Sequence, residues 1–178
     1  MREIIQFLLL TVIIVAPIRI YLAQPYIVSG SSMDPTFSGG DYLIVDRLSY
    51  RLHEPERGDV IIFRFPLETS KFFIKRVIGL PGETVILTEG EVTIRSALGE
   101  IALTEPYVAH VGKDDLVISL GERDYFVMGD NREASLDSRA WGPVDRNFIV
   151  GRTLLRLFPV SEAAYLPGST SYAEVPAN

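Results

Sequence analysis

A helical period is almost absent from this chain beyond residue 23. The sequence there consists of short runs rich in Val, Ile, Phe and Tyr, separated by turns built from Gly, Pro, Asp and Ser. We count roughly nine runs that are long enough for one strand each. They are 24–28, 42–46, 60–65, 71–78, 84–87, 91–95, 116–120, 125–128 and 154–158. Many short strands with little helix predict a mainly β, barrel-like antiparallel fold.

The strands suggest one domain over residues 24–160 with a small addition. Residues 84–87 and 91–95 alternate around a Thr-Glu-Gly turn, which is typical of a β-hairpin. We expect residues 84–123 to form a small β lobe inserted into the main sheet. Residues 161–178 are rich in Ser, Ala and Pro, and this composition predicts a flexible C-terminal tail.

The N-terminus is strongly apolar. Residues 4–18 carry no charge, Arg19 interrupts the run, and apolar residues continue to Ala23. A membrane-spanning helix needs about 20 mostly apolar residues. The segment reaches this length if Arg19 lies near the interface and extends its charge to water. We therefore predict that residues 1–23 are a transmembrane anchor that contacts the lipid bilayer through residues 4–23. A cleaved signal peptide and a buried core helix are the alternatives, although no clear Ala-x-Ala site follows the run.

The composition excludes several classes of function. A net charge of −6 argues against a nucleic-acid partner. The absence of Cys excludes disulfides and thiolate metal sites, and no cluster of His, Asp and Glu has metal-ligand spacing, so we expect no metal and no cofactor. His53 and His110 are the only histidines, and neither lies in a run that looks like a site. The sequence therefore offers no evident histidine for a Ser-His-Asp triad.

Ser32 lies in a run of small residues between an apolar strand and a Pro-Thr turn. Because Pro35 fixes its own φ and disfavours helix at Asp34, the hydroxyl of Ser32 is expected at a strand-to-turn junction. The run could be an ordinary polar loop. If Ser32 is a nucleophile, a lysine is its more plausible base, since histidine is scarce.

Lys75 is the lysine that best fits this role. It lies in a strand in which Phe73 and Val77 share its face, so apolar side chains flank it. Burial lowers the pKa of a lysine, and only the neutral amine can accept a proton from a hydroxyl. The alternative is a strand lysine that extends its amine to water.

A third polar stretch follows the strand at 125–128. Ser135, Asp137 and Arg139 occur at steps of two, so they share a face if the segment is extended. Asp137 and Arg139 could pair, with Ser135 beside them. An exposed salt bridge that contributes about 0–1 kcal/mol is the alternative interpretation.

Three motifs occur in order behind the apolar segment. They are Ser32-Met33-x-Pro35-Thr36, Lys75-Arg76-x-x-Gly79-x-Pro81-Gly82, and Gly129-Asp130-Asn131-Arg132-x-x-Ser135-x-Asp137-Ser138-Arg139. Together they resemble the motifs of the type I signal peptidases, which are membrane-anchored serine endopeptidases with a Ser-Lys dyad. The resemblance covers residues 4–158, and it is specific because all three motifs are present in order.

This resemblance implies a role for each matching residue. Ser32 would be the nucleophile, Lys75 the general base, and Ser135 the hydroxyl that orients the lysine, with Asp137 and Arg139 as a supporting pair. The backbone N–H of Ser32 would be one oxyanion donor. Some members of the family have a serine donor two residues before the nucleophile, but Gly30 occupies that position here, so Ser31 is our tentative second donor.

The resemblance also implies the reaction and its place. The chain would cleave signal peptides from exported preproteins after small residues at −1 and −3. Its catalytic domain would face the extracytoplasmic side of the cell membrane on a single-pass anchor. A self-cleaving Ser-Lys repressor is a rival, but such proteins carry a DNA-binding domain where this chain is apolar. A membrane-tethered binding domain without catalysis is a second rival, although every proposed catalytic position is filled.

Overall fold

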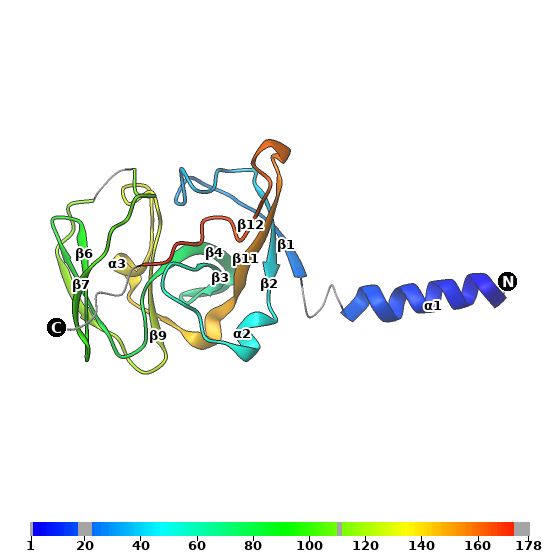
Figure 1. Cartoon of the computed structure of the whole chain (residues 1–178), viewed down its shortest axis with the longest axis horizontal. Helices are drawn as coiled ribbons and strands as arrows, with labels where there is room; N and C mark the ends of the chain where they lie inside the picture. Colours follow the sequence, from blue (N-terminus) through cyan, green and yellow to red (C-terminus); the bar gives the residue numbers. More distant parts are fainter. Residues whose placement is uncertain (1, 18–22, 110–111, 173–178) are drawn as a thin grey trace.

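The computed structural model of the chain describes residues 2–17, 23–109 and 112–172 (Figure 1). It is mainly β, as the sequence predicts, with antiparallel strands in two sheets. The helical elements are α1 (Arg2–Pro17), α2 (Ser49–Leu52), α3 (Ser138–Trp141), η2 (Arg146–Phe148) and η3 (Val160–Glu162).

The larger sheet has eight strands and holds the middle of the molecule (Figure 1). Its strands are β1 (Ala23–Ile27), β2 (Tyr42–Asp46), β3 (Val60–Phe65), β4 (Glu68–Gly79), β9 (Asp124–Met128), β10 (Val144–Asp145), β11 (Ile149–Phe158) and β12 (Ala164–Tyr165). The order is β1-β2-β11-β3-β4-β9-β10, with β12 added to β11. Within the described residues this path is open, because β1 and β10 end it, so the expected barrel-like arrangement is not a closed barrel.

The smaller sheet comes from one continuous part of the chain. It consists of β5 (Thr84–Thr88), β6 (Glu91–Ser96), β7 (Gly99–Ala102) and β8 (Leu116–Ser119), in the order β7-β6-β5-β8. Its inner face packs on Ile78, Phe126 and Met128 of the larger sheet and forms one hydrophobic cluster with them. These residues lie in the range that we expected to form an inserted lobe.

β3 and β4 position the functional residues, and their sequences explain their place in the sheet. The first four residues of β3 are buried on both faces, which suits a strand between β11 and β4. β4 pairs with β3 along most of its length, whereas β9 pairs with β4 only from Arg76 to Gly79. The first half of β4 therefore has β3 on one side and no strand of the described residues on the other.

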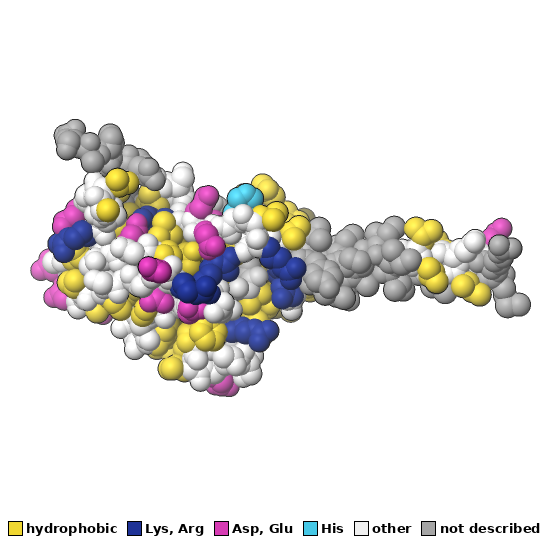
Figure 2. Space-filling model, turned by 90° about the horizontal axis from the view of Figure 1, so that it is seen from below, with side chains coloured by type: hydrophobic (Ala, Val, Ile, Leu, Met, Phe, Trp, Pro, Cys, Tyr) yellow, Lys and Arg dark blue, Asp and Glu magenta, His cyan; other side chains and the backbone are white. Residues whose placement is uncertain are grey.

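The N-terminal helix α1 extends away from the β domain (Figure 1). Ile4, Ile5, Phe7, Leu9 and Leu10 are all exposed on it, and Figure 2 shows hydrophobic side chains on its N-terminal part. None of the helices in the described residues is both long enough and apolar enough to span a bilayer. Residues 18–22 of the expected anchor lie outside the described part of the chain.

The last part of the chain that the structure describes lies against the sheet. The sequence suggests a flexible tail over 161–178. In the structure, however, η3 is followed by β12, which pairs with β11. Beyond β12 the backbone of Thr170 approaches Gly58 so closely that a Cβ there would lie 1.8 Å from its carbonyl oxygen. Residues 173–178 of this expected tail, and His110, lie outside the described residues.

Candidate active site

Ser32 lies in the turn that follows β1. The strand is extended by hydrogen bonds between Val28 and the segment at Gly40 and Asp41. In the turn that follows, Met33 and Phe37 are fully buried and pack in the hydrophobic core. These anchors fix the backbone, so the half-buried hydroxyl of Ser32 is presented at the surface of the turn as the sequence suggests.

Lys75 lies at the centre of β4 and points at this hydroxyl. Its Nζ is 2.6 Å from Oγ of Ser32, and it also donates a hydrogen bond to the carbonyl oxygen of Ile74 at 3.0 Å. The side chain is 4% exposed. The ring of Phe73 lies 5.6 Å from Nζ on the same face of the strand, as its alternation predicts. The fold therefore joins two residues that are 43 positions apart in the sequence.

The surroundings of Lys75 favour its neutral form. Burial lowers the pKa of Lys75 from its usual 10.5 to about 8, because an ammonium group loses its hydration in the interior. The carboxylates of Asp137 and Asp130 act in the opposite direction and raise it, whereas Arg139 lowers it further. At this pKa about a tenth of Lys75 is neutral at pH 7 and about half at pH 8.

Gly129 brings the third motif against Ser32. The backbone N–H of Asn131 donates to the carbonyl oxygen of Ser32 at 3.1 Å. A Cβ at Gly129 would lie 2.3 Å from that carbonyl oxygen and 2.3 Å from Oγ of Ser135. Only glycine allows this approach. The hydroxyl of Ser135 is therefore a close neighbour of the Ser32 backbone.

Ser135 does not form its expected contact, whereas Asp137 and Arg139 do. Its Oγ is buried, and the expected bond to Lys75 is not formed in this structure. Asp137 and Arg139 do pair, at 2.8 Å, and Asp137 accepts from the N–H of Gly129 at 3.0 Å. Although burial alone would raise the pKa of Asp137, hydrogen bonds from Arg139, Ser135 and Gly129 lower it. The pair is buried rather than an exposed salt bridge.

Ser31, the expected second oxyanion donor, lies on the exposed side of the turn next to Gly30. Gly30 and Ser31 are both exposed. Gly30 has a φ of +86°, which favours glycine. The space beside it is open, with no atom within 4 Å of an ideal Cβ. A side-chain donor at position 30 is thus excluded by the residue itself, as the sequence indicates.

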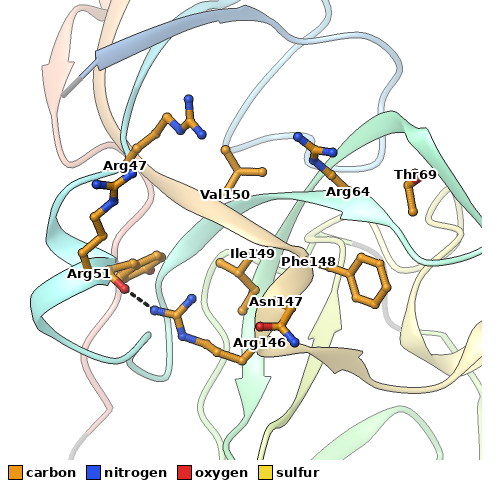
Figure 3. A pocket seen from close by; sticks show the side chains of 10 residues that line it. Arg47, Arg51, Arg64, Thr69, Arg146, Asn147, Phe148, Ile149 and Val150 are labelled. Carbon is orange, nitrogen blue, oxygen red and sulfur yellow. Dashed lines mark hydrogen bonds between the residues drawn. The ribbon is translucent and has the colours of Figure 1, made fainter. Parts of the chain in front are cut away.

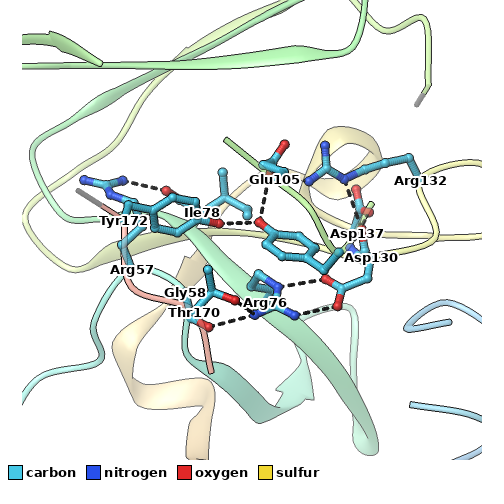
Figure 4. A network of polar contacts seen from close by, with 12 residues as sticks. Arg57, Gly58, Arg76, Ile78, Glu105, Asp130, Arg132, Asp137, Thr170 and Tyr172 are labelled. Carbon is cyan, nitrogen blue, oxygen red and sulfur yellow. Dashed lines mark hydrogen bonds and ion pairs between the residues drawn. The ribbon is translucent and has the colours of Figure 1, made fainter. Parts of the chain in front are cut away.

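Arg76 and Asp130, which belong to the sequence motifs but were assigned no role there, form a buried ion pair (Figure 4). Arg76 donates to both oxygens of Asp130, at 2.8 and 2.6 Å, and both side chains are almost fully buried. Thr36, four residues after Ser32, donates to the same carboxylate at 2.5 Å. This pair therefore ties the strand of Lys75 to the turn of Ser32.

The same arginine binds the C-terminal segment. It donates to the carbonyl oxygens of Gly58 and Gly168, and its guanidinium lies 3.8 Å from the centre of the Tyr107 ring. Tyr107 in turn contacts the hydroxyl of Tyr172 and donates to Glu105 (Figure 4). Sequence reasoning missed this network because its members are distant in the chain. The adjacency of Arg76 to Lys75 was the available signal.

A groove of about 550 Å³ opens in front of the dyad. Its floor and walls come from β1, the Ser32 turn and the first half of β4, and Ser31 and Leu136 also line it. Most of the other lining side chains are apolar: Tyr26, Ile27, Val28, Leu43, Ile62, Phe72, Phe73, Ile74 and Ala134. A peptide in the groove would therefore meet apolar walls and two strand edges.

Comparison with known proteins gives a consistent match. The family model described as signal peptidase, peptidase S26, matches residues 1–158. The chain is 38% identical over 172 residues to signal peptidase I of Leptolyngbya laminosa, covering 92% of this chain and 82% of the relative. It is 37% identical over 161 residues to the probable signal peptidase I-2 of Synechocystis sp. (strain ATCC 27184 / PCC 6803 / Kazusa), covering 87% and 72%.

A solved structure is similar as well. The crystal structure of a signal peptidase I from Enterococcus faecalis V583 superposes with a TM-score of 0.50 at 31% sequence identity. The match covers 56% of this chain and 97% of that structure. Both comparisons agree with the resemblance that the three motifs carry.

Proposed function

The chain belongs to the signal peptidase family, peptidase S26, and from this premise we propose that it cleaves signal peptides from preproteins with Ser32 as the nucleophile and Lys75 as the general base. Membership in the family makes it a serine endopeptidase. The observation that carries the assignment of the dyad is the 2.6 Å distance between Nζ of Lys75 and Oγ of Ser32. A base within about 2.6–3.2 Å of the proton that it removes satisfies the geometric requirement.

Neutral Lys75 accepts the proton of Ser32 as Oγ attacks the carbonyl carbon of the scissile bond. The resulting oxyanion is stabilised by hydrogen-bond donors, and protonated Lys75 returns a proton to the leaving amine as the C–N bond breaks. Water then attacks the acyl-enzyme, with Lys75 again as the base, and releases Ser32. The low pKa of Lys75 makes both the uptake and the return of this proton possible near neutral pH.

The neighbouring polar groups have supporting roles in this proposal. When Lys75 is protonated, its ammonium can donate to the buried hydroxyl oxygen of Ser135. Asp137 holds the N–H of Gly129, and Arg139 holds Asp137, so this pair fixes the loop that carries Ser135. Asp137 and Arg139 therefore position the site without touching the reacting atoms.

For the oxyanion we propose the backbone N–H of Ser32 as one donor. The second donor is an N–H or hydroxyl of the exposed turn, for which Ser31 is the nearest candidate. Loss of one oxyanion donor typically costs about 2.7–4 kcal/mol of transition-state stabilisation, so a second donor is needed at this position.

The substrate would bind as an added strand. β1 has β2 on one side, and the first half of β4 has β3 on one side, so each offers an edge to the groove within the described part of the chain. An extended peptide between these edges gains backbone hydrogen bonds, and its alternate side chains enter the apolar groove. Such a groove fits the small residues that precede the cleavage site of signal peptides.

We further propose that residues 4–23 anchor the chain in the membrane and that the β domain lies on the extracytoplasmic face. The apolar run supports this proposal, and so do the exposed apolar side chains of α1. Exposed Ile, Leu and Phe side chains on a helix are unfavourable in water but favourable in a bilayer.

The test is cleavage of a detergent-solubilised preprotein by the full chain, with the products located by mass spectrometry. Wild type should cut once, after an Ala-x-Ala site. Ser32→Ala and Lys75→Met should each lose all detectable cleavage while remaining folded, since each substitution keeps a similar volume. Ser38→Ala and Lys113→Met change exposed residues away from the groove and should cleave as wild type does. Cleavage that survives Ser32→Ala would show that another serine is the nucleophile.

A further inference from the structure

A second cavity, of about 440 Å³, lies outside the groove and is lined by arginines (Figure 3). Arg47, Arg51, Arg64 and Arg146 converge on it from the region after β2, from α2, from β3 and from η2. Four separate elements thus bring cationic side chains to one place. We call this cavity the arginine pocket.

The lining of the arginine pocket is suited to a phosphate group. Its other lining residues are Tyr50, Thr69, Asn147, Phe148, Ile149 and Val150, so no carboxylate is among the described residues that line it. Thr69 and Asn147 add neutral hydrogen-bond donors. Guanidinium groups match phosphate oxygens in a bidentate manner. Because the whole chain carries a net charge of −6, this concentration of positive charge is local.

Arg146 is held in place before any ligand binds. It donates to the carbonyl oxygen of Tyr50 (Figure 3) and pairs with Glu54 at 2.6 Å, and its side chain is 19% exposed. Glu54 is 74% exposed, so water screens much of its charge. The pocket therefore remains positively charged. One of its four arginines, Arg146, is already fixed in position.

The arginine pocket lies at the end of the β domain where the proposed anchor joins it. Ala23 at the start of β1 pairs with Asp46, and Arg47 follows directly and donates to the side chain of Gln24 at 3.3 Å. Only five residues separate Pro17 of α1 from Ala23. They can bridge at most about 20 Å. Ala23, whose partner strand leads directly to Arg47, is therefore within about 20 Å of the end of α1.

Exposed apolar residues lie close in the chain to residues that line the pocket. Leu48 and Leu52 alternate with the arginines of α2 and its approach, and Leu67 lies in the turn between β3 and β4, next to Arg64 and Thr69. Leu52 and Leu67 are 73% and 76% exposed. In Figure 2 hydrophobic and basic side chains adjoin each other on the part of the body nearest to α1. Cationic and apolar side chains together are typical of a membrane interface.

We propose that the arginine pocket binds the phosphate of an anionic phospholipid headgroup. Leu48, Leu52 and Leu67 would then contact the lipid acyl chains near the membrane surface. This proposal rests on the proposed membrane anchorage, because that anchorage places the pocket at the bilayer surface. Arg64 also lies 5.7 Å from the ring of Phe72 at the edge of the groove. Headgroup binding thus orients the groove relative to the membrane from which the substrate emerges.

The test is a titration of the full chain, in micelles of a neutral detergent, with dihexanoyl phosphatidylglycerol, dihexanoyl phosphatidylcholine and inorganic phosphate. Calorimetry should show saturable binding of phosphatidylglycerol, weakened by salt, and no binding of phosphatidylcholine. Arg51→Gln should reduce the affinity about fivefold, and Arg51→Gln with Arg64→Gln should reduce it about 30-fold. Arg95→Gln, a change of the same charge on the smaller sheet, should bind as wild type does.

Two outcomes of the titration would contradict the proposal. Equal binding of inorganic phosphate and phosphatidylglycerol would make the pocket a site for free anions. Equal weakening by Arg95→Gln and Arg51→Gln would show an effect of net charge alone. Cleavage of a soluble peptide by the same samples separates the two proposals: Arg51→Gln should leave it unchanged, and a wild type that binds phosphatidylglycerol but does not cleave would overturn the proposed function alone.

Discussion

The burial of Lys75 favours catalysis but lowers the stability of the folded protein. A general base for Ser32 must be neutral and close, and burial in β4 provides both, since the side chain is 4% exposed and Nζ lies 2.6 Å from Oγ. The same burial destabilises the folded protein whenever the amine is protonated. The residue therefore contributes to activity at the expense of stability.

The free energy of unfolding should reveal this conflict. The pKa of Lys75 is about 8 in the folded state, compared with about 10.4 in an unfolded chain. Below pH 8 both states are protonated and the folded state bears the full penalty, about 3 kcal/mol. Between about pH 8 and 10.4 the unfolded state binds more protons, so the penalty disappears as the pH rises. Lys75→Met should thus be more stable than wild type at pH 7, and the difference should shrink toward pH 10 in urea denaturation. A difference that does not change with pH would contradict the account.

Asp137 should tune the same lysine. Its carboxylate raises the pKa of Lys75, whereas Arg139 lowers it. Asp137→Asn keeps an acceptor for the N–H of Gly129 but removes the negative charge, so the pKa of Lys75 should fall and the acid limb of kcat/KM should move to lower pH. Asp114→Asn is the matched control, because Asp114 also pairs with Arg139 but lies half-exposed away from Lys75. An acid limb shifted equally by both variants would exclude a specific role for Asp137.

At the scale of elements, the site depends on the loop after β9 as much as on the strands. Gly129→Ala would place a Cβ 2.3 Å from both the Ser32 carbonyl oxygen and Oγ of Ser135. Because a displacement of about 1 Å can reduce catalysis about 100-fold, we expect kcat/KM to fall by about that factor in peptide cleavage. Gly39→Ala meets its nearest atom at 3.6 Å and should be nearly neutral. Wild-type activity in Gly129→Ala would show that the loop does not set the geometry of Ser32.

The elements also show what the sequence could predict. The longer strands followed from their apolar runs, and the burial of Lys75 followed from the alternation within 71–78. β7, β10 and β12 were missed because two to four residues carry too little pattern. The pair of Arg76 and Asp130 was missed because 54 residues separate its members, and periodicity describes neighbours only.

For the whole molecule, the C-terminal segment links the two sheets to the site. Its composition suggested a flexible tail, but composition does not reveal that Gly168 and Thr170 hold Arg76 or that Tyr172 contacts Tyr107. Their loss would leave a buried guanidinium with fewer acceptors, and each lost partner costs about 1–3 kcal/mol.

Two truncated chains test this link. A chain that ends at Pro167 loses two acceptors of Arg76 and should be less stable than one that ends at Tyr172, by about 2–6 kcal/mol in urea denaturation. Both lack the residues beyond 172, so the difference isolates residues 168–172. Equal midpoints for the two chains would show that these contacts contribute nothing to stability.

The pH dependence of kcat/KM for cleavage of a peptide with Ala at −3 and −1 tests the central claim most directly, because it reports the protonation of the free enzyme. If neutral Lys75 is the base, kcat/KM of wild type rises with pH and levels off above an apparent pKa of about 8. A rate that is already level from pH 6 upward, or one that still rises beyond pH 10, would contradict the assignment of a buried, neutral Lys75 as the base for Ser32.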